Sequence, residues 1–118
     1  MICSRAAKYL WDAHRAAEWI VNFTAGRSYN EYLTDKMLSS AVERQFEIIG
    51  EALIRLRRTE PETAAMVPDV SDIIGFRNVL VHDYDGIDVQ EVWATIQRDV
   101  PKLLSALADL LRRAPPLE

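Results

Sequence analysis

The chain has 118 residues, of which 49% are hydrophobic and 27% charged. This length predicts one domain, and this composition is typical of a globular protein rather than a disordered chain. The single cysteine, Cys3, excludes an intrachain disulfide, and no apolar run approaches the ~20 residues of a membrane helix. We therefore expect a cytoplasmic protein with no membrane partner. Its net charge of −4 disfavours non-specific nucleic-acid binding, so such a role would need a local site.

The first half of the chain predicts two long helices. Apolar residues recur at helical spacing over about 4–24, and Gly26 follows as a stop signal. A second helix is expected over about 29–58, with a break or bend near Thr34 or Gly50. Its apolar stripe is expected to comprise Leu33, Met37, Ala41, Phe46, Ile49, Leu53 and Leu56.

A short helical turn is expected near 61–66, and a third helix is expected to start within 68–72. Asp69 or Ser71 can cap this helix, because both side chains accept hydrogen bonds from free N–H groups. We expect the helix to end within 83–86, at an aspartate- and glycine-containing stretch.

The fourth helix is expected to begin after Asp88, another capping candidate. Pro101 lies inside its apolar pattern and should bend the helix or mark a junction. Four main helices joined by short connections predict an all-α fold, an antiparallel bundle of four to five helices. We expect one domain over 1–114 and a disordered tail over 115–118.

Residues 73–84 carry the most informative polar side chains. On a helical projection Arg77 lies at the centre of an apolar arc, which is formed by Ile73, Ile74, Phe76, Leu80 and Val81. Asn78 and His82 are one turn apart at the edge of this arc, and Tyr84 follows.

An arginine on an apolar face is costly unless its charge is paired or the face meets a partner. Arg77 could pair with a carboxylate of the same chain, such as Glu47 or Glu51, inside a purely structural monomer. Alternatively, the apolar face around it could be the interface of a symmetric dimer. The residues alone leave both alternatives open.

Four of these residues together have the parts for RNA cleavage without a metal ion: Arg77, Asn78, His82 and Tyr84. Histidine titrates near neutrality and can deprotonate a 2′-hydroxyl or protonate the leaving 5′-oxygen. Arg77 can hold two phosphate oxygens as negative charge develops, and Asn78 can orient either group. The motif supplies only one histidine and one arginine per chain, which is few for this reaction, and a dimer would supply two copies of each.

The run 77–84 resembles the R-x4-H-x-Y motif of HEPN-domain proteins. The fuller pattern, RNxLVHxY followed by Ile87-Asp88, is similar to the HepT-like toxin family, whose partners are MntA-type nucleotidyltransferase antitoxins. Gly50-Glu51-Ala52, Phe76 and the closing segment 92–104 also resemble that family.

The resemblance implies a HEPN-like bundle that dimerises through the motif helix. It further implies a metal-independent endoribonuclease toxin of a type II or type VII-like toxin–antitoxin system. Arg77 and His82 would be the catalytic pair, and Asn78 would occupy the polar position beside them. Tyr84 would accept AMP from the nucleotidyltransferase antitoxin. Neither a metal nor a cofactor is expected.

A second hypothesis is a non-catalytic dimeric module that binds a nucleotidyltransferase or a nucleotide. The basic cluster over 55–58 also has two interpretations: cations at a helix C-terminus, where they interact favourably with the dipole, or an RNA-binding patch near the site.

Overall fold

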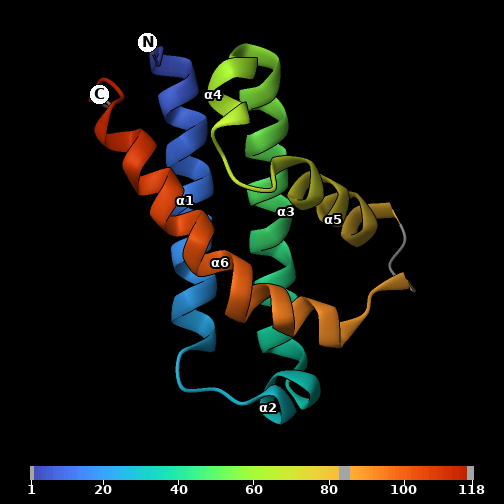
Figure 1. Ribbon diagram of the computed structural model, residues 1–118. Helices are drawn as coiled ribbons and strands as arrows, with labels where there is room; N and C mark the ends of the chain where they lie inside the picture. Colours follow the sequence, from blue (N-terminus) through green and yellow to red (C-terminus); the bar gives the residue numbers. More distant parts are fainter. Residues whose placement is uncertain (1, 83–85, 117–118) are drawn as a thin grey trace.

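The computed structural model describes residues 2–82 and 86–116, and every regular element within them is helical (Figure 1). The predicted all-α class is thereby confirmed. In chain order the described helices are α1 (Ser4–Thr24), α2 (Tyr29–Thr34), α3 (Lys36–Thr59), α4 (Pro61–Ala65), α5 (Val70–His82) and α6 (Val89–Arg112). Two of the helices, α2 and α4, are short, with 6 and 5 residues, and lie in the chain between longer helices.

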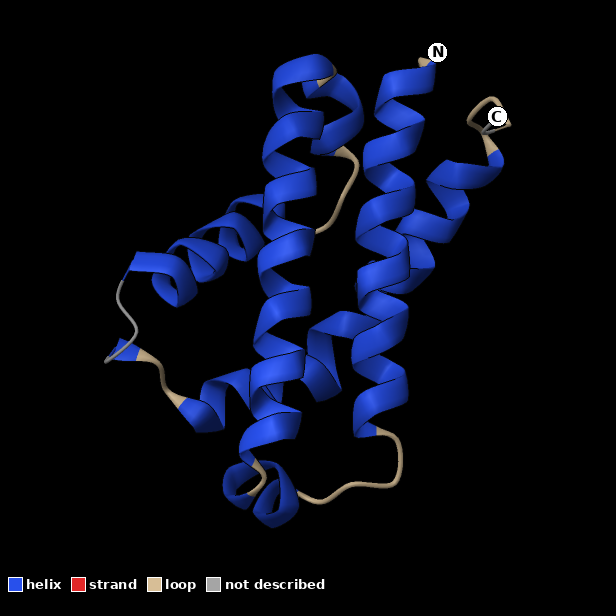
Figure 2. Ribbon diagram, turned by 180° about the vertical axis from the view of Figure 1, so that it is seen from behind, coloured by secondary structure: helices blue, strands red, loops and turns tan. Residues whose placement is uncertain are grey.

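The centre of the fold is the pair α1 and α3, which run side by side in opposite directions (Figure 2). Helix α6 crosses α1, and α5 packs against α3 and leads away from it (Figure 1). Alanines dominate the buried face of α1 and let its neighbours approach closely. The fully buried side chains at the centre include Leu10, Ala13, Ile20, Val42, Ile49, Leu53, Val100 and Leu107.

The predicted break near Thr34 is confirmed, and Gly50 remains inside α3 without interrupting it. Asp35 lies between α2 and α3 with extended backbone angles, φ −101° and ψ 98°. Its carboxylate accepts a hydrogen bond from the backbone N–H of Leu38 at 3.1 Å and so caps α3. One residue therefore both ends α2 and starts α3.

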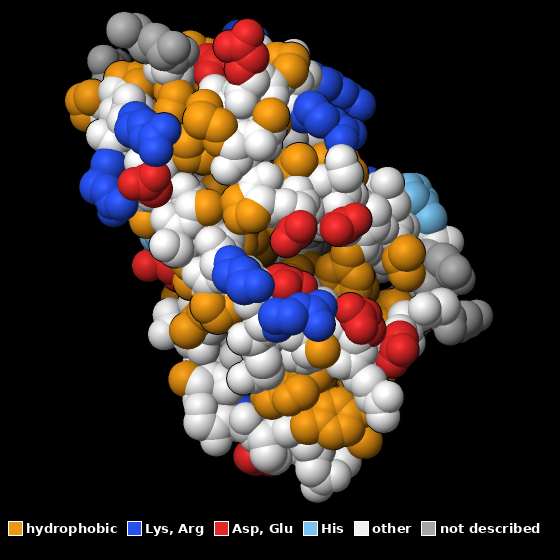
Figure 3. Space-filling model, viewed as in Figure 1, with side chains coloured by type: hydrophobic (Ala, Val, Ile, Leu, Met, Phe, Trp, Pro, Cys, Tyr) orange, Lys and Arg blue, Asp and Glu red, His pale blue; other side chains and the backbone are white. Residues whose placement is uncertain are grey.

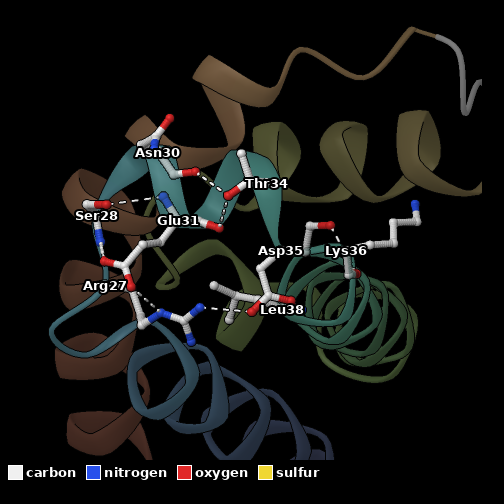
Figure 4. Close-up of polar contacts among 9 residues, drawn as sticks. Arg27, Ser28, Asn30, Glu31, Thr34, Asp35, Lys36 and Leu38 are labelled. Carbon is white, nitrogen blue, oxygen red and sulfur yellow. Dashed lines mark hydrogen bonds and ion pairs between the residues drawn. The ribbon is translucent and has the colours of Figure 1, made fainter.

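The polar contacts around this break are shown in Figure 4. Ser28 and Glu31 form a reciprocal capping box at the start of α2. The guanidinium of Arg27 joins the two helices, because it contacts Glu31 at 3.2 Å and Asp35 at 2.8 Å. These contacts link α2 to the residue that caps α3.

The break also explains where the predicted apolar stripe is wrong. Leu33 is exposed, and Met37 is 85% exposed. The stripe was extended with one helical period across the expected break, and a non-helical Asp35 changes the rotational phase of everything that follows it. The buried stripe of α3 starts instead at Leu38 and continues through Val42 and Phe46.

Two other predicted boundaries agree with the structure, whereas the predicted end of the third helix within 83–86 falls mostly outside the described residues. The predicted turn near 61–66 is α4, and the carboxylate of Asp88 caps α6 by accepting from Gln90 and Glu91. Pro101 marks no junction, because α6 continues through it to Arg112. Pro101 and the preceding-turn residue Gln97 are both exposed, so water can satisfy the carbonyl that the proline leaves unpaired.

The long helices are amphipathic. Within residues 2–82 and 86–116, no helix combines the length and the apolar character needed to cross a bilayer.

Candidate functional site

Arg77 extends from α5 across the surface of α3 at Gly50. A Cβ atom on Gly50 would lie 2.2 Å from the Cβ and 2.4 Å from the Cγ of Arg77. Such distances are far below ordinary carbon–carbon contact. Only a glycine at position 50 therefore lets α5 approach α3 this closely, and the stem of Arg77 fills the space that a side chain would occupy.

The guanidinium of Arg77 has two partners of different kinds. Its terminal nitrogens donate to Oε2 of Glu51 at 3.2 Å and to Oδ1 of Asn78 at 2.9 Å. The structure thus confirms the intrachain pairing considered for Arg77, with Glu51 as the partner. Glu47, the other carboxylate considered, contacts Arg44 at 3.4 Å instead.

The Arg77 side chain is 21% exposed, so most of it is held by packing while its charged end reaches the surface. Within the described chain its Nε is buried without a hydrogen-bond partner. Glu51 is 42% exposed, so an incoming anion can reach the ion pair from the groove. Such an anion can replace the carboxylate, because it offers the guanidinium the same charge-assisted hydrogen bonds.

His82 is the last residue of α5, and its side chain is exposed. It lies five positions after Arg77, an offset that corresponds to about 140° around the helix axis and about 7.5 Å along it. The structure therefore brings Arg77 and Asn78 together but directs His82 to another side of the same helix. Asn78, one turn before His82, lies on the histidine side. Tyr84 lies outside the described residues.

A groove of about 490 Å³ lies on the Arg77 side of α5, bounded by α1 and α3. Its walls carry cationic, anionic and apolar side chains in one continuous surface. The lining residues are Tyr9, Asp12, Arg44, Glu47, Ile48, Glu51, Ala52, Arg55, Arg77 and Val81. In the part of the chain that the structure describes, no group of three or more His, Cys, Asp or Glu residues could hold a metal ion.

Two arginines of this groove lie outside the motif. Arg44 was not recognised from the sequence, whereas Arg55 belongs to the basic cluster over 55–58, for which an RNA-binding patch near the site was one of two interpretations. A signal for them exists, because positions 44, 48, 51 and 55 recur at i, i+4, i+7 and i+11 and share one face of a helix. That signal needs the partner helix to be interpreted, since nothing in α3 alone says that Arg77 lies against this face.

A second hollow, of about 400 Å³, lies between α5 and α6 (Figure 3). Its apolar floor is rimmed by charged side chains, of which four are carboxylates: Asp69, Asp72, Glu91 and Asp99. The only cations lining it among the described residues are Arg98 and Lys102. This excess of negative charge disfavours a polyanion, so the groove around Arg77 is the better candidate for binding a phosphate.

A family model and several known proteins are similar to this chain, and all of them are described as ribonucleases. A family model described as "Ribonuclease HepT-like" matches residues 13–110. The chain is 38% identical over 95 residues to "Putative RNase MJ1380" of Methanocaldococcus jannaschii, covering 80% of this chain and 86% of that protein.

Two further relatives come from other organisms. The chain is 36% identical over 99 residues to "Probable ribonuclease HepT" of Thermococcus cleftensis, covering 80% of this chain and 86% of the relative. It is 30% identical over 105 residues to "Putative RNase TTE0752" of Caldanaerobacter subterraneus subsp. tengcongensis, covering 89% of this chain and 93% of that protein. No solved structure matches the chain.

Proposed function

Because the chain belongs to the HepT-like ribonuclease family and is therefore a ribonuclease, we propose that it cleaves RNA internally and without a metal ion. Arg77 and His82 are the catalytic pair of this proposal, and Asn78 orients the guanidinium. The observation that carries it is the placement of Arg77. Its stem is fixed against Gly50, and its charged end lies at the surface of a groove beside an exchangeable carboxylate.

The chemistry follows from these side chains. One imidazole removes the proton of a ribose 2′-hydroxyl, and the 2′-oxygen attacks the adjacent phosphorus. Arg77 leaves Glu51 and binds the non-bridging oxygens as their negative charge increases. A protonated imidazole gives its proton to the departing 5′-oxygen. The products are a 2′,3′-cyclic phosphate and a 5′-hydroxyl, so atoms and charges balance without water or a metal.

A symmetric dimer supplies the second imidazole. The angle of about 140° between Arg77 and His82 on α5 supports this arrangement, because one chain directs the two side chains apart. Val81 is an exposed apolar residue near the end of α5 and is a candidate for the dimer contact. Since Val81 also lines the groove, a contact there would bring the partner's His82 towards Arg77.

Incubation of the purified protein with single-stranded RNA in EDTA tests this proposal. The wild type should produce fragments that end in a cyclic phosphate, whereas Arg77→Ala and His82→Ala should each lose this activity. Arg98→Ala is the matched control, because Arg98 is an exposed, carboxylate-paired arginine on α6 away from the groove. Undiminished cleavage by His82→Ala would remove the histidine from the mechanism.

We also place the activity in a toxin–antitoxin pair, as the RNxLVHxY pattern suggests. In this proposal an MntA-type nucleotidyltransferase transfers AMP to Tyr84: the phenol oxygen attacks the α-phosphorus of ATP, and pyrophosphate leaves. The added phosphate and base then block RNA beside His82. Mass spectrometry after incubation with such an enzyme and ATP should show an added AMP on the wild type and none on Tyr84→Phe. Equal labelling of both would refute Tyr84 as the acceptor.

A further inference from the structure

We infer that the α3 face of the groove is a track for the RNA backbone, in which Arg44 and Arg55 bind phosphates on either side of the one that is cleaved. This inference rests on the proposed RNA cleavage and extends it from the scissile phosphate to its neighbours. It assigns binding roles to two arginines that lie outside the motif helix.

The geometry of α3 carries the first step. At 100° per residue, positions 44, 48, 51 and 55 fall within about 60° of one another on the helix surface. All four line the groove. Arg44 and Arg55 are therefore about 16 Å apart along α3, a distance that corresponds to about five nucleotides of a stacked strand at about 3.4 Å each.

Arg77 enters this row from α5 at the level of Glu51, between the two arginines. It is one helical turn from Arg55 and about two turns from Arg44. A phosphate held by Arg77 would thus have a cation close to it on one side and a second cation further away on the other. Three guanidiniums in one row match the regular spacing of charges in a nucleic-acid backbone.

Carboxylates of the groove hold these guanidiniums in place without saturating them. Of the Arg55 guanidinium, only Nε donates to Glu51, at 3.0 Å. Of the Arg44 guanidinium, one terminal nitrogen donates to Glu47, at 3.4 Å. Within the described residues, the remaining guanidinium nitrogens of Arg44 and Arg55 make no hydrogen bond. A guanidinium has five N–H donors, so each can bind a phosphate in addition to its carboxylate or in place of it.

Exposure and charge are compatible with this role. The side chains of Arg44 and Arg55 are 67% and 56% exposed, so an RNA strand can reach them. Ion pairs as exposed as these contribute little to stability, so a phosphate can replace the carboxylate at little cost. The third carboxylate of the groove, Asp12, is already paired with Lys8 at 2.6 Å. Apolar and aromatic surface between the cations, from Tyr9 and Ile48, is available to the bases.

The first test measures RNA binding in the His82→Ala background, where the substrate stays intact. The probe is a fluorescein-labelled single-stranded RNA of twelve mixed-sequence nucleotides, and its dissociation constant is measured against salt concentration. Added Arg44→Ala and Arg55→Ala substitutions should each raise the dissociation constant about five-fold and flatten its logarithmic salt dependence by about 0.7. Added Arg98→Ala should change neither, because its side chain is 57% exposed but lies outside the groove.

The second test separates binding of neighbouring phosphates from an effect of Arg55 on Glu51 and Arg77. A dinucleoside monophosphate contains only the scissile phosphate. With His82 intact, Arg55→Ala should raise KM for the long RNA but not for this dinucleotide. Arg55→Lys should restore most of the KM and the salt dependence, because the charge is retained.

The outcomes distinguish the two proposals. If wild type cleaves RNA but the Arg44 and Arg55 variants bind the long RNA as the Arg98 variant does, the track is refuted and the cleavage proposal stands. If Arg55→Ala impairs the dinucleotide as strongly as the long RNA, Arg55 acts through Arg77 and the track is likewise refuted. If wild type cleaves neither substrate, the proposed cleavage itself fails.

Discussion

Replacement of Gly50 by alanine tests how α3 positions the catalytic arginine. The added Cβ would lie 2.2 Å from the Cβ of Arg77. Since the clashing atom is fixed to the α5 backbone, rotation of the Arg77 side chain cannot relieve the contact. The helices must separate locally by about 1.3 Å to reach 3.5 Å, the shorter end of ordinary carbon–carbon contact.

The size of the effect follows from two opposing contributions. Overpacking costs about 1–3 kcal/mol, and the higher helix propensity of alanine offsets about 1 kcal/mol of it. We therefore expect Gly50→Ala to lose up to about 2 kcal/mol of unfolding free energy. A displacement of a catalytic group by about 1 Å can reduce the rate about 100-fold, so the loss of RNA cleavage should exceed the loss of stability.

Gly75→Ala is the matched control, because Gly75 is also helical and a Cβ there would meet nothing within 4 Å. This variant should gain about 1 kcal/mol of stability and keep its activity. Thermal unfolding followed by circular dichroism, together with cleavage of a labelled RNA, measures both quantities. A Gly50→Ala protein as stable and as active as Gly75→Ala would refute the close packing of Arg77 on α3.

Three further changes have defined expectations. Glu51→Gln should lower KM for RNA, because it removes the carboxylate that competes with phosphate for Arg77, and it should also lower kcat, because the guanidinium loses a positioning partner; an unchanged KM would contradict the competition. His82→Ala should abolish cleavage yet keep the unfolding free energy within about 0.5 kcal/mol of wild type, since the side chain is exposed; a large loss in urea unfolding would show a structural role. The pKa of the Asp35 carboxyl is lowered mainly by its hydrogen bond from Arg27 and next by that from the Leu38 backbone. The stability that this carboxylate contributes is therefore present above about pH 4 and is lost as the pH falls through the lowered value. Asp35→Asn should be less stable than wild type at pH 7 and approach it at pH 3, and a difference in unfolding midpoint that stays constant with pH would contradict this.

Helix boundaries were predictable wherever a local signal existed. The apolar period of α1 and the cap at Asp88 are properties of a few neighbouring residues, and the structure agrees with the elements they predict. The exposure of Met37 was not predictable in this way. It depends on how Asp35 resets the helical phase, which an apolar pattern extended across the break does not contain.

The candidate site shows the same division between local and tertiary information. Its motif residues on α5 were recognisable in the sequence, and the pairing of Arg77 with Glu51 was one of the alternatives. The role of Gly50 was not recognisable, because it arises where α5 crosses α3 and involves residues 27 positions apart in the chain. The placement of Arg55 beside Arg77 depends on the same crossing.

The central claim is that the His82 imidazoles of both subunits act with Arg77 on one phosphate, and subunit mixing tests it most directly. Equal amounts of wild-type and His82→Ala chains are unfolded together and refolded, so that half of the dimers should be mixed and a quarter wild type. A mixed dimer keeps one imidazole and should be inactive, so the mixture should show about a quarter of the cleavage rate of wild type at the same total concentration. A rate of about half would contradict a site that needs an imidazole from each subunit.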